Sequence, residues 1–283
     1  MLCPMRTPEQ TTVLITGATD GLGRGVAKRL AATGVRVLLH GRDQDRLDAV
    51  AGEIREVTGR EPPQGFVADL ASLEEVRRLA DEVTAATDEL HVLVNNAGIG
   101  SGKPDGTKRR ESRDGHELRF AVNYLAGFAL TLALLPLLRW SAPARIVNVA
   151  SLGQAPLDFE DPMLERGYDG SRAYGQSKLA QITFSNELAD RLDPAEVTVT
   201  SLHPATYMPT KMVLEQVGRS VDTLEEGVEA TARLAIAPEL EGISGRFFDR
   251  QSESRAHAQA YDPEARTRLW ELSAALTGED LLT

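Results

Sequence analysis

The stretch TVLITGATDGLG, residues 12–23, is the part of the sequence that most strongly predicts the fold. A short β-rich run is followed by a turn with glycines at positions 17, 21 and 23, and then by apolar residues at helical spacing. Glycines let the backbone turn sharply and approach a pyrophosphate, which then faces the N-terminus of the helix. The stretch therefore predicts a strand, a nucleotide-binding turn and a helix, although a plain strand-to-helix turn has the same composition.

The same alternation continues along the chain. Further strands are expected at 35–39, 65–68, 92–94, 145–149, 197–201 and 245–248, and further helices at 43–58, from Ser72 onward, and at 115–138, 171–191 and 225–237. This rhythm implies a parallel sheet covered by helices on both faces. We expect one α/β domain over residues 11–283, a Rossmann-type, doubly wound, seven-stranded and mostly parallel sheet, after a flexible leader at 1–10. Substrate loops are expected near 100–114, 152–170 and 205–221, because ligands of such sheets bind at the carboxyl ends of strands.

Composition narrows the possible partners. The chain has 283 residues, with 42 acidic against 31 basic side chains and a net charge of −11, which disfavours nucleic acid and anionic membranes. The single Cys3 excludes an intramolecular disulfide and fits a reducing cytosol. The longest apolar run, 125–138, contains Gly127 and Pro136 and is shorter than a membrane span, so we expect a buried helix. The prediction is a cytoplasmic protein with no membrane or nucleic-acid partner and no metal site.

Tyr174 and Lys178 lie four residues apart in an expected helix, on one helical face. A free phenol has a pKa near ~10, and a fixed cation beside it moves that pKa toward neutrality. A Tyr-x-x-x-Lys pattern alone is common on solvated helix faces, but the glycine-rich turn favours a catalytic interpretation here.

The end of the second strand, His40-Gly41-Arg42-Asp43, predicts which nicotinamide cofactor would bind. A carboxylate at this place binds the ribose hydroxyls of NAD, whereas an arginine suits the 2′-phosphate of NADP. Gly41 stands where the acid is expected and Arg42 follows it, so the sequence favours NADP(H). The alternative is a surface arginine paired with Asp43 or Asp45.

Polar and small residues follow the third and fourth strands. Asp69 could accept the adenine amino group or cap a turn, and the residues alone leave both open. Asn95-Asn96-Ala97-Gly98 would let a nucleotide ribose approach the backbone, and one of the two asparagines could serve only to tie neighbouring strands together.

These motifs, with Ser151 after the fifth strand, occur in the order and spacing of the short-chain dehydrogenase/reductase family, over roughly residues 12–248. Leu157-Asp158-Phe159, the run at 172–178 and the run at 40–43 resemble the branch with retinol dehydrogenases and protochlorophyllide reductase. The chain is therefore identified as a member of this family, with the family's fold and chemistry as expectations.

The resemblance implies roles for four residues. Tyr174 would be the general acid/base, and Lys178 would lower the tyrosine pKa and bind the nicotinamide ribose. Ser151 would hydrogen-bond the substrate oxygen, and Asn123 would hold a water in a proton relay to the lysine. The chemistry agrees, because ketone reduction needs a hydride and a proton for the developing alkoxide. From the residues alone, Ser151 could also be a turn residue at the end of a strand, and Asn123 could be a polar group that kinks a helix.

Other site residues follow from the motifs. Cofactor contacts are expected from Gly17, Thr19, Asp20, Gly21, Leu22, Gly23, Arg42, Asp69, Leu70, Asn96, Ala97, Gly98, Tyr174, Lys178, Pro204 and Thr206. The family usually has Pro-Gly after the sixth strand, but Ala205 replaces the glycine, which weakens the assignment of Thr206. A downstream family threonine is uncertain, because Thr210 comes one place late.

The expected pocket is mainly apolar. Its predicted lining is Leu152, Gln154, Leu157, Tyr168, Tyr207 and Met208, which favours a small lipophilic carbonyl compound. The predicted function is an NADP(H)-dependent oxidoreductase that interconverts this carbonyl and its alcohol. A catalytically silent nucleotide-binding sensor or scaffold is one alternative, and an epimerase or dehydratase with a transient keto form is another. The resemblance also implies a possible homodimer or homotetramer, since the family often pairs through the helices of Asn123 and Tyr174. The apolar stretch 130–138 could form that interface or belong to the core.

Overall fold

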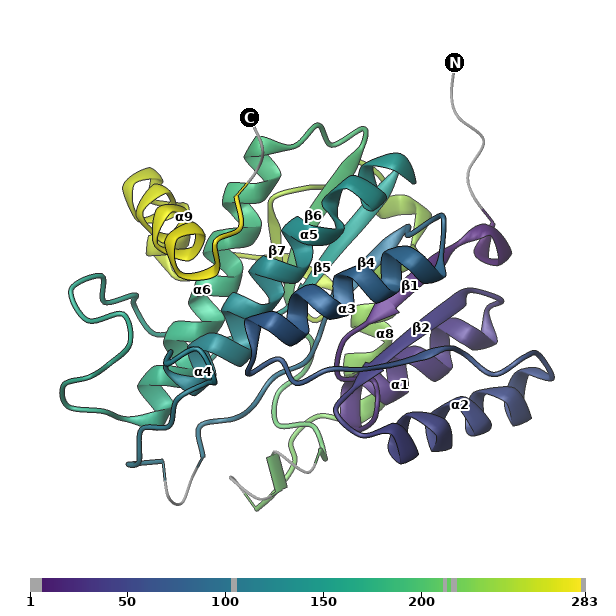
Figure 1. The fold of residues 1–283 in the computed structure, drawn as a ribbon, viewed down its shortest axis with the longest axis horizontal. Coiled ribbons are helices and arrows are strands. Elements are labelled where there is room, and N and C mark those ends of the chain that lie inside the picture. The colour runs from purple at the N-terminus through teal and green to yellow at the C-terminus, as the bar shows by residue number, and fades with distance from the viewer. Residues whose placement is uncertain (1–6, 103–105, 211–212, 215–217, 281–283) are drawn as a thin grey trace.

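An eight-stranded sheet forms the middle layer of the computed structural model, which describes residues 7–102, 106–210, 213–214 and 218–280 (Figure 1). Its order is β3-β2-β1-β4-β5-β6-β7-β8. The strands are β1 (Thr12–Ile15), β2 (Arg36–Gly41), β3 (Gly65–Val67), β4 (Val92–Asn95), β5 (Ala144–Val149), β6 (Val197–His203), β7 (Arg246–Asp249) and β8 (Ser252–Ser254). Neighbours from β3 to β7 pair in parallel. The strand order runs outward in opposite senses from β1 and from β4, so the switch point where such folds bind ligands lies between these two strands.

The parallel α/β fold is confirmed, with one strand more than expected. β8 pairs antiparallel with β7 at the sheet edge. Its sequence is Ser-Glu-Ser and all three residues are exposed, so it carries no apolar alternation by which a strand is recognised. The leader also differs, because Pro8–Gln10 form a 3₁₀ turn that Thr7 and Gln10 cap reciprocally. Proline is tolerated at the first helical position, where its missing N–H is not needed.

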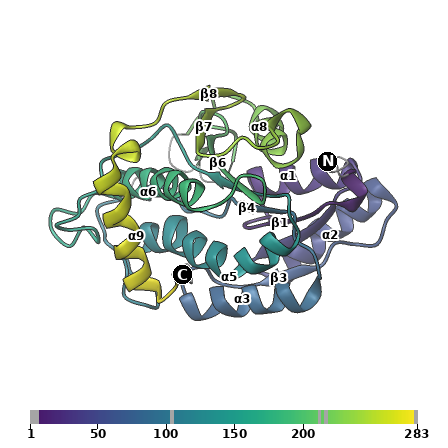
Figure 2. The ribbon, with the colours of Figure 1, turned by 90° about the horizontal axis from the view of Figure 1, so that it is seen from above.

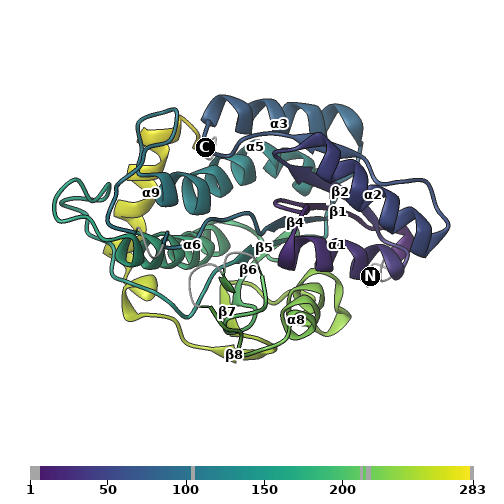
Figure 3. The same ribbon diagram turned by 90° about the horizontal axis from the view of Figure 1, so that it is seen from below.

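Helices cover both faces of the sheet, as Figures 2 and 3 show. The helices are α1 (Gly21–Ala32), α2 (Gln44–Thr58), α3 (Leu73–Ala86), α4 (Leu118–Phe120), α5 (Ala126–Trp140), α6 (Gly170–Arg191), α8 (Leu224–Ile236) and α9 (Pro263–Thr277). One apolar core lies under α3, α5, α6 and α9, and a second lies under α1, α2 and α8. Strands of a parallel sheet are buried on both faces, which is why β1 and β4 are wholly buried.

The helix expected at 115–138 is interrupted. α4 is a single turn, Ala121–Leu125 form a π-helical turn, and α5 follows. Together Leu118–Trp140 form the one helix, among the described residues, that is long and apolar enough to cross a membrane by length and composition. The expectation of too short a run was therefore wrong, but 72% of its apolar window is buried within the domain, as in a core helix. The π turn matters for the site, because it contains Asn123.

The C-terminal helix α9 was not expected from the sequence. Its Trp270 packs against Phe128 of α5 and Phe184 of α6, with ring centroids 5.3 Å and 6.1 Å apart. Its Ser273 hydroxyl lies 2.6 Å from the Tyr124 hydroxyl in the π turn. α9 therefore occupies part of the α5 and α6 surface that was expected to pair two copies of the chain.

Candidate active site

The glycine-rich turn after β1 is packed too closely for larger residues. Gly17 has a φ of +66°, and a Cβ there would lie 2.9 Å from the Ala97 Cα. A Cβ on Gly23 would lie 2.3 Å from the Gly17 carbonyl oxygen. The first turn of α1 therefore lies directly against the end of β1, and its backbone N–H groups face the switch point between β1 and β4.

Two side chains brace this turn. His40 accepts a hydrogen bond from the Gly17 N–H at Nδ1 (3.2 Å) and donates from Nε2 to the Ala68 carbonyl (3.1 Å), so its imidazole is neutral with the proton on Nε2. Burial lowers the pKa of His40 to about 4. Asn96 donates from Nδ2 to the Thr16 carbonyl at 2.8 Å, so its side chain holds the turn rather than facing open space. Sequence reasoning gave His40 no role, because a lone histidine carries no sign of its partners.

The corner after β2 is basic and admits no side chain at position 41. A Cβ on Gly41 would lie 2.5 Å from the Thr19 Cγ2, so an acid there is excluded unless Thr19 moves. Arg42 is exposed and forms no ion pair with a described residue, and Asp43 caps α2 instead of pairing with it. A second guanidinium, Arg46, lies nearby, with Nη2 3.0 Å from Asp20 Oδ2. Sequence reasoning missed Arg46.

Several expected cofactor residues also have contacts within the protein. Asp20 caps α1 through the Gly21 N–H at 2.7 Å, in addition to its contact with Arg46. Asp69 Oδ1 accepts from the Ala71 N–H at 3.0 Å, which is the turn-capping alternative. The side chains of Leu22 and Leu70 are 7% and 6% exposed and belong to the two apolar cores.

Ser151, Tyr174 and Lys178 are brought together at the carboxyl ends of β4 and β5. A Cβ on Gly153 would lie 3.4 Å from Ser151 Oγ and 3.7 Å from Tyr174 Cε1, so these two side chains are close neighbours, and Lys178 Nζ lies 5.8 Å from the Tyr174 ring centroid. Nζ donates to the Val149 carbonyl at 2.9 Å. A Cβ on Gly98 would lie 3.7 Å from this nitrogen, so the lysine faces the expected cofactor loop after β4.

Burial sets the proton affinities of this group. It raises the pKa of the Tyr174 phenol, the Ser151 hydrogen bond opposes that shift, and the nearby Tyr207 phenol adds to it. It lowers the pKa of the Lys178 ammonium to about 7. The expected lowering of the tyrosine pKa by the lysine is therefore outweighed by desolvation in the chain alone. A protonated phenol at neutral pH is a proton donor.

Asn123 holds the loop after β4. Its Oδ1 accepts from the Ile99 N–H at 2.7 Å, and its Nδ2 donates to the Ile99 carbonyl at 3.1 Å and to Ser177 Oγ at 2.9 Å. The side-chain amide is thus bonded to backbone and to the catalytic helix α6. The water relay that the family implies remains a prediction.

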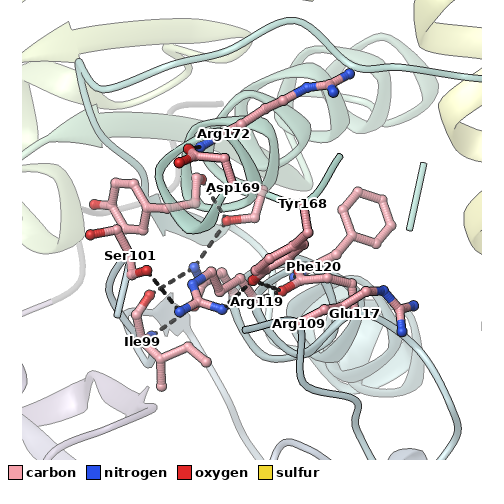
Figure 4. Close-up of polar contacts among 12 residues, drawn as sticks. Ile99, Ser101, Arg109, Glu117, Arg119, Phe120, Tyr168, Asp169 and Arg172 are labelled. Carbon is pink, nitrogen blue, oxygen red and sulfur yellow. Dashed lines mark hydrogen bonds and ion pairs between the residues drawn. The ribbon is translucent and has the colours of Figure 1, made fainter. Parts of the chain in front are cut away.

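Tyr168, which is expected to line the substrate pocket, is half-buried, and its hydroxyl is hydrogen-bonded to Glu117 and Arg119. Figure 4 shows it pointing into a buried polar cluster, which we call the Arg119 cluster and define as Glu117, Arg119 and Tyr168. Tyr168 donates from its hydroxyl to Glu117 Oε1 at 2.9 Å and accepts from Arg119 Nη1 at 2.5 Å. Arg119 also donates to the carbonyls of Gly100 and Ser101, both at 2.8 Å.

The other expected pocket residues divide into two groups. Leu157 and Met208 are buried in the cores, and Gln154 is fixed by bonds from its amide to the Ser151 carbonyl and from the His257 N–H. Leu152 and Tyr207 are 45% and 48% exposed, and both lie beside the Ser151–Tyr174 pair. These two remain on the rim of the site.

Hydrogen bonds to charged side chains fix the segment that follows β6. Thr206 Oγ1 contacts His203 Nε2 at 3.0 Å and accepts from Arg250 Nη2 at 3.2 Å, and its N–H donates to Asp222 Oδ2 at 2.7 Å. Pro204 is buried and Thr206 is half-buried, and their expected cofactor contacts remain predictions. Thr210 was left uncertain, but its Cγ2 would lie 3.0 Å from a Cβ on Gly21, above the glycine-rich turn.

A glycine-rich turn at the switch point of a parallel sheet, beside a serine, tyrosine and lysine, defines a dinucleotide-dependent oxidoreductase of the Rossmann type. The family model of short chain dehydrogenases matches residues 11–219, and the chain belongs to that family. Its relatives place it in the retinol dehydrogenase branch of the family.

Relatives in the retinol dehydrogenase branch are similar along most of the chain. Retinol dehydrogenase 14 of Mus musculus is 37% identical over 94% of this chain and 86% of its own length. Among solved structures, one from Mycobacterium paratuberculosis is 28% identical, with a TM-score of 0.78 over 99% of this chain and 98% of the other. A short chain dehydrogenase of Shigella flexneri complexed with NADP is 28% identical, with a TM-score of 0.70 over 85% of this chain and 97% of its own.

Proposed function

We propose that the protein is an NADP(H)-dependent oxidoreductase that interconverts a lipophilic carbonyl compound and its alcohol. The observation that carries this proposal is the grouping of Ser151, Tyr174 and a buried Lys178 at the edge of the sheet where the glycine-rich turn lies. When bound, the nicotinamide supplies or accepts the hydride. The chain's own residues handle the proton and the developing negative charge.

Each residue has a distinct task in reduction. Tyr174 is protonated at neutral pH and donates its phenolic proton to the oxygen that gains charge. Ser151 donates a hydrogen bond to the same oxygen. Lys178 uses one donor on the Val149 carbonyl and keeps another for a ribose hydroxyl on the side of Gly98. In the oxidative direction, Tyr174 takes the proton back.

The decisive test is Tyr174→Phe, assayed with NADPH at a wavelength that follows its oxidation. Tyr261→Phe is the matched control, because it removes a partly buried hydroxyl that binds only the Ala256 N–H, away from the site. We expect the control to keep full turnover and Tyr174→Phe to lose about 10²- to 10⁴-fold of it. Retained turnover in Tyr174→Phe would contradict the proton-donor role of Tyr174. NADPH binding without turnover in the unaltered protein would favour the silent sensor or scaffold, and a product other than the alcohol would favour an epimerase or dehydratase.

The cofactor preference rests on the corner after β2. Gly41 stands where NAD-dependent relatives need an acid, a Cβ there would lie 2.5 Å from Thr19 Cγ2, and Arg42 is exposed and unpaired with described residues. The Shigella relative complexed with NADP supports the same assignment. We expect Arg42→Ala to raise the KM for NADPH by about 10- to 100-fold, the worth of a charge-assisted contact, and to leave the KM for NADH unchanged. An equal effect on both cofactors would contradict a 2′-phosphate contact.

The substrate class rests on the rim and on the relatives. Leu152 and Tyr207 expose apolar surface beside Tyr174, and the similar proteins are named retinol dehydrogenases 11 to 14. A panel of retinaldehyde, nonanal and acetophenone, each with NADPH and with NADH, tests this directly. We expect kcat/KM to be higher for the lipophilic aldehydes than for a hydrophilic one such as glyceraldehyde. The reverse order would contradict a lipophilic substrate.

A further inference from the structure

Gln181 lies behind the catalytic lysine, on the side away from the tyrosine. It follows Lys178 by three residues on α6, so both side chains leave the helix on one face. Its Oε1 accepts a hydrogen bond from Lys178 Nζ at 2.8 Å. Gln181 is 4% exposed and Lys178 is 5% exposed, so water does not compete for this contact.

The orientation of the Gln181 amide is fixed from both ends. An ammonium has only donors, so the amide oxygen must face it and the NH₂ group must point the other way. Gln181 also lines a cavity of about 10 Å³ with Thr16, Asn95 and Asn123. The Asn95 Oδ1, from another residue that lines this cavity, is buried and has no hydrogen-bond partner within the part of the chain that the structure describes. A cavity of this size is at the lower limit for one water molecule.

The surroundings of Lys178 hold no opposite charge. Besides Gln181, the groups that lie near its nitrogen are the Tyr174 ring on α6, the Val149 carbonyl on β5 and Gly98 in the β4 loop. No carboxylate of the described residues lies within ion-pair distance of Nζ. The Gln181 oxygen is therefore the side-chain acceptor that holds the ammonium.

We propose that Gln181 is a positioning residue, which fixes the Lys178 ammonium from behind and so keeps a cation beside the Tyr174 phenol. The inference rests on the proposed function, because it assigns Tyr174 the proton transfer. A neutral acceptor suits this task, since it stabilises the ammonium less than a carboxylate would and leaves the lysine free to respond to a bound ribose.

The direct test is the titration of Lys178 itself. The chain has five lysines, so protein labelled with ¹³C at the lysine Cε gives few NMR signals, and Lys178→Arg assigns the relevant one. We expect Gln181→Met to lower the Lys178 midpoint from its already depressed value near 7, because an acceptor is lost. We expect Gln181→Glu to raise it by about one to three pH units, because the acceptor becomes charged. Midpoints equal to the wild type in both variants would overturn the proposal.

The second measurement connects the contact to turnover. With nonanal and saturating NADPH, the pH profile of kcat should move with the NMR midpoint, downward for Gln181→Met and upward for Gln181→Glu, while the KM for NADPH changes less than kcat. Gln176→Met is the matched control on the same helix, because its amide binds the Pro162 carbonyl and the Asp158 N–H and does not contact Lys178. It should leave the Lys178 midpoint in place.

The outcomes separate this proposal from the proposed function. Shifted midpoints with an unchanged kcat profile would overturn the catalytic part of the role of Gln181. Full turnover in Tyr174→Phe would instead defeat the proposed proton transfer, whatever the Lys178 midpoints show. If Gln181→Met does not fold, the Lys178 midpoint and the kcat profile of Gln181→Glu still test the proposal. This variant keeps an acceptor oxygen on a side chain of nearly the same length.

Discussion

At the scale of single residues, His40 shows how one buried side chain shapes the nucleotide turn. Its two ring nitrogens join the Gly17 N–H to the Ala68 carbonyl, so it couples the ends of β1, β2 and β3. Only the neutral ring can do this, since a protonated Nδ1 cannot accept a hydrogen bond. The turn is therefore expected to be sensitive to acid.

The first prediction concerns this sensitivity. The folded-state pKa of His40 is lowered from 6.5 to about 4, so the unfolded chain binds a proton first as the pH falls. The stability that His40 contributes is complete above pH 6.5 and is lost between about 6.5 and 4, by an amount on the order of 3 kcal/mol. Urea unfolding at a series of pH values should show this slope, and His40→Gln should flatten it. An equal slope in the variant would mean that other groups cause the loss.

At the scale of elements, α4 and the π turn hold the loop after β4 with two side chains in succession. Arg119 binds the Gly100 and Ser101 carbonyls, and Asn123, four residues later, binds both backbone groups of Ile99. The other end of the Arg119 cluster reaches Tyr168, just before α6 begins at Gly170. The cluster thus joins the β4 loop to the start of the catalytic helix.

The second prediction concerns the Arg119 cluster. Arg119→Met leaves the Glu117 carboxylate buried without its cation, so the free energy of unfolding should fall by about 3–5 kcal/mol. Tyr168→Phe removes one hydroxyl and should cost about 1–3 kcal/mol. Denaturant unfolding measures both. A loss below about 0.5 kcal/mol for Arg119→Met would show that the cluster adds nothing to stability.

The third prediction concerns the ends of the segment 206–222. Val221 N–H donates to the Tyr207 carbonyl and Asp222 N–H to the Thr206 carbonyl, both at 3.0 Å, and Arg250 pairs with the Asp222 carboxylate. Asp222→Asn removes the charge, so hydrogen exchange at these amides should become faster. Arg46→Gln, which removes the exposed pair with Asp20, is the control that should leave them unchanged. Unaltered exchange in Asp222→Asn would show that the backbone bonds suffice.

At the scale of the whole molecule, α9 completes the core that carries the site. The aromatic cluster of Tyr124, Phe128, Phe184 and Trp270 links the π turn, α5, α6 and α9 through edge and tilted contacts. Since the π turn holds Asn123 and α6 holds Tyr174, the C-terminal helix stabilises both catalytic elements from outside.

The fourth prediction tests this with two tryptophans. Trp270 is 4% exposed and Trp140 is 80% exposed, so the same substitution probes a core and a surface position. Trp270→Ala should lower the free energy of unfolding by about 3–5 kcal/mol, and Trp140→Ala should change it by less than about 0.5 kcal/mol. Denaturant unfolding measures the pair. Similar losses in the two variants would mean that α9 does not share the core.

The sequence predicted what depends on local pattern. The parallel α/β order, the glycine-rich turn and the helix with Tyr174 and Lys178 all follow from spacing that only one local geometry satisfies. The sequence did not reveal β8, whose three residues are all polar. It also did not reveal the hydrogen-bond partners of Tyr168, which come from elements about fifty residues earlier in the chain. Neither feature leaves a periodic signal.

The amino-acid sequence by itself determined the order of strands and helices and the types of side chain available at the sheet edge. It could do so because hydrophobic periodicity and the positions of glycines fix the local backbone conformation within a few residues. Only the tertiary structure decided which side chains form hydrogen bonds within the protein, as Asp69 and Gln154 do. It also decided which side chains meet at the candidate active site, as Ser151 and Tyr174 do. The physical reason is that hydrogen-bond partners and desolvation depend on groups far apart in the chain. That is also why burial, and not the neighbouring lysine, sets the tyrosine pKa.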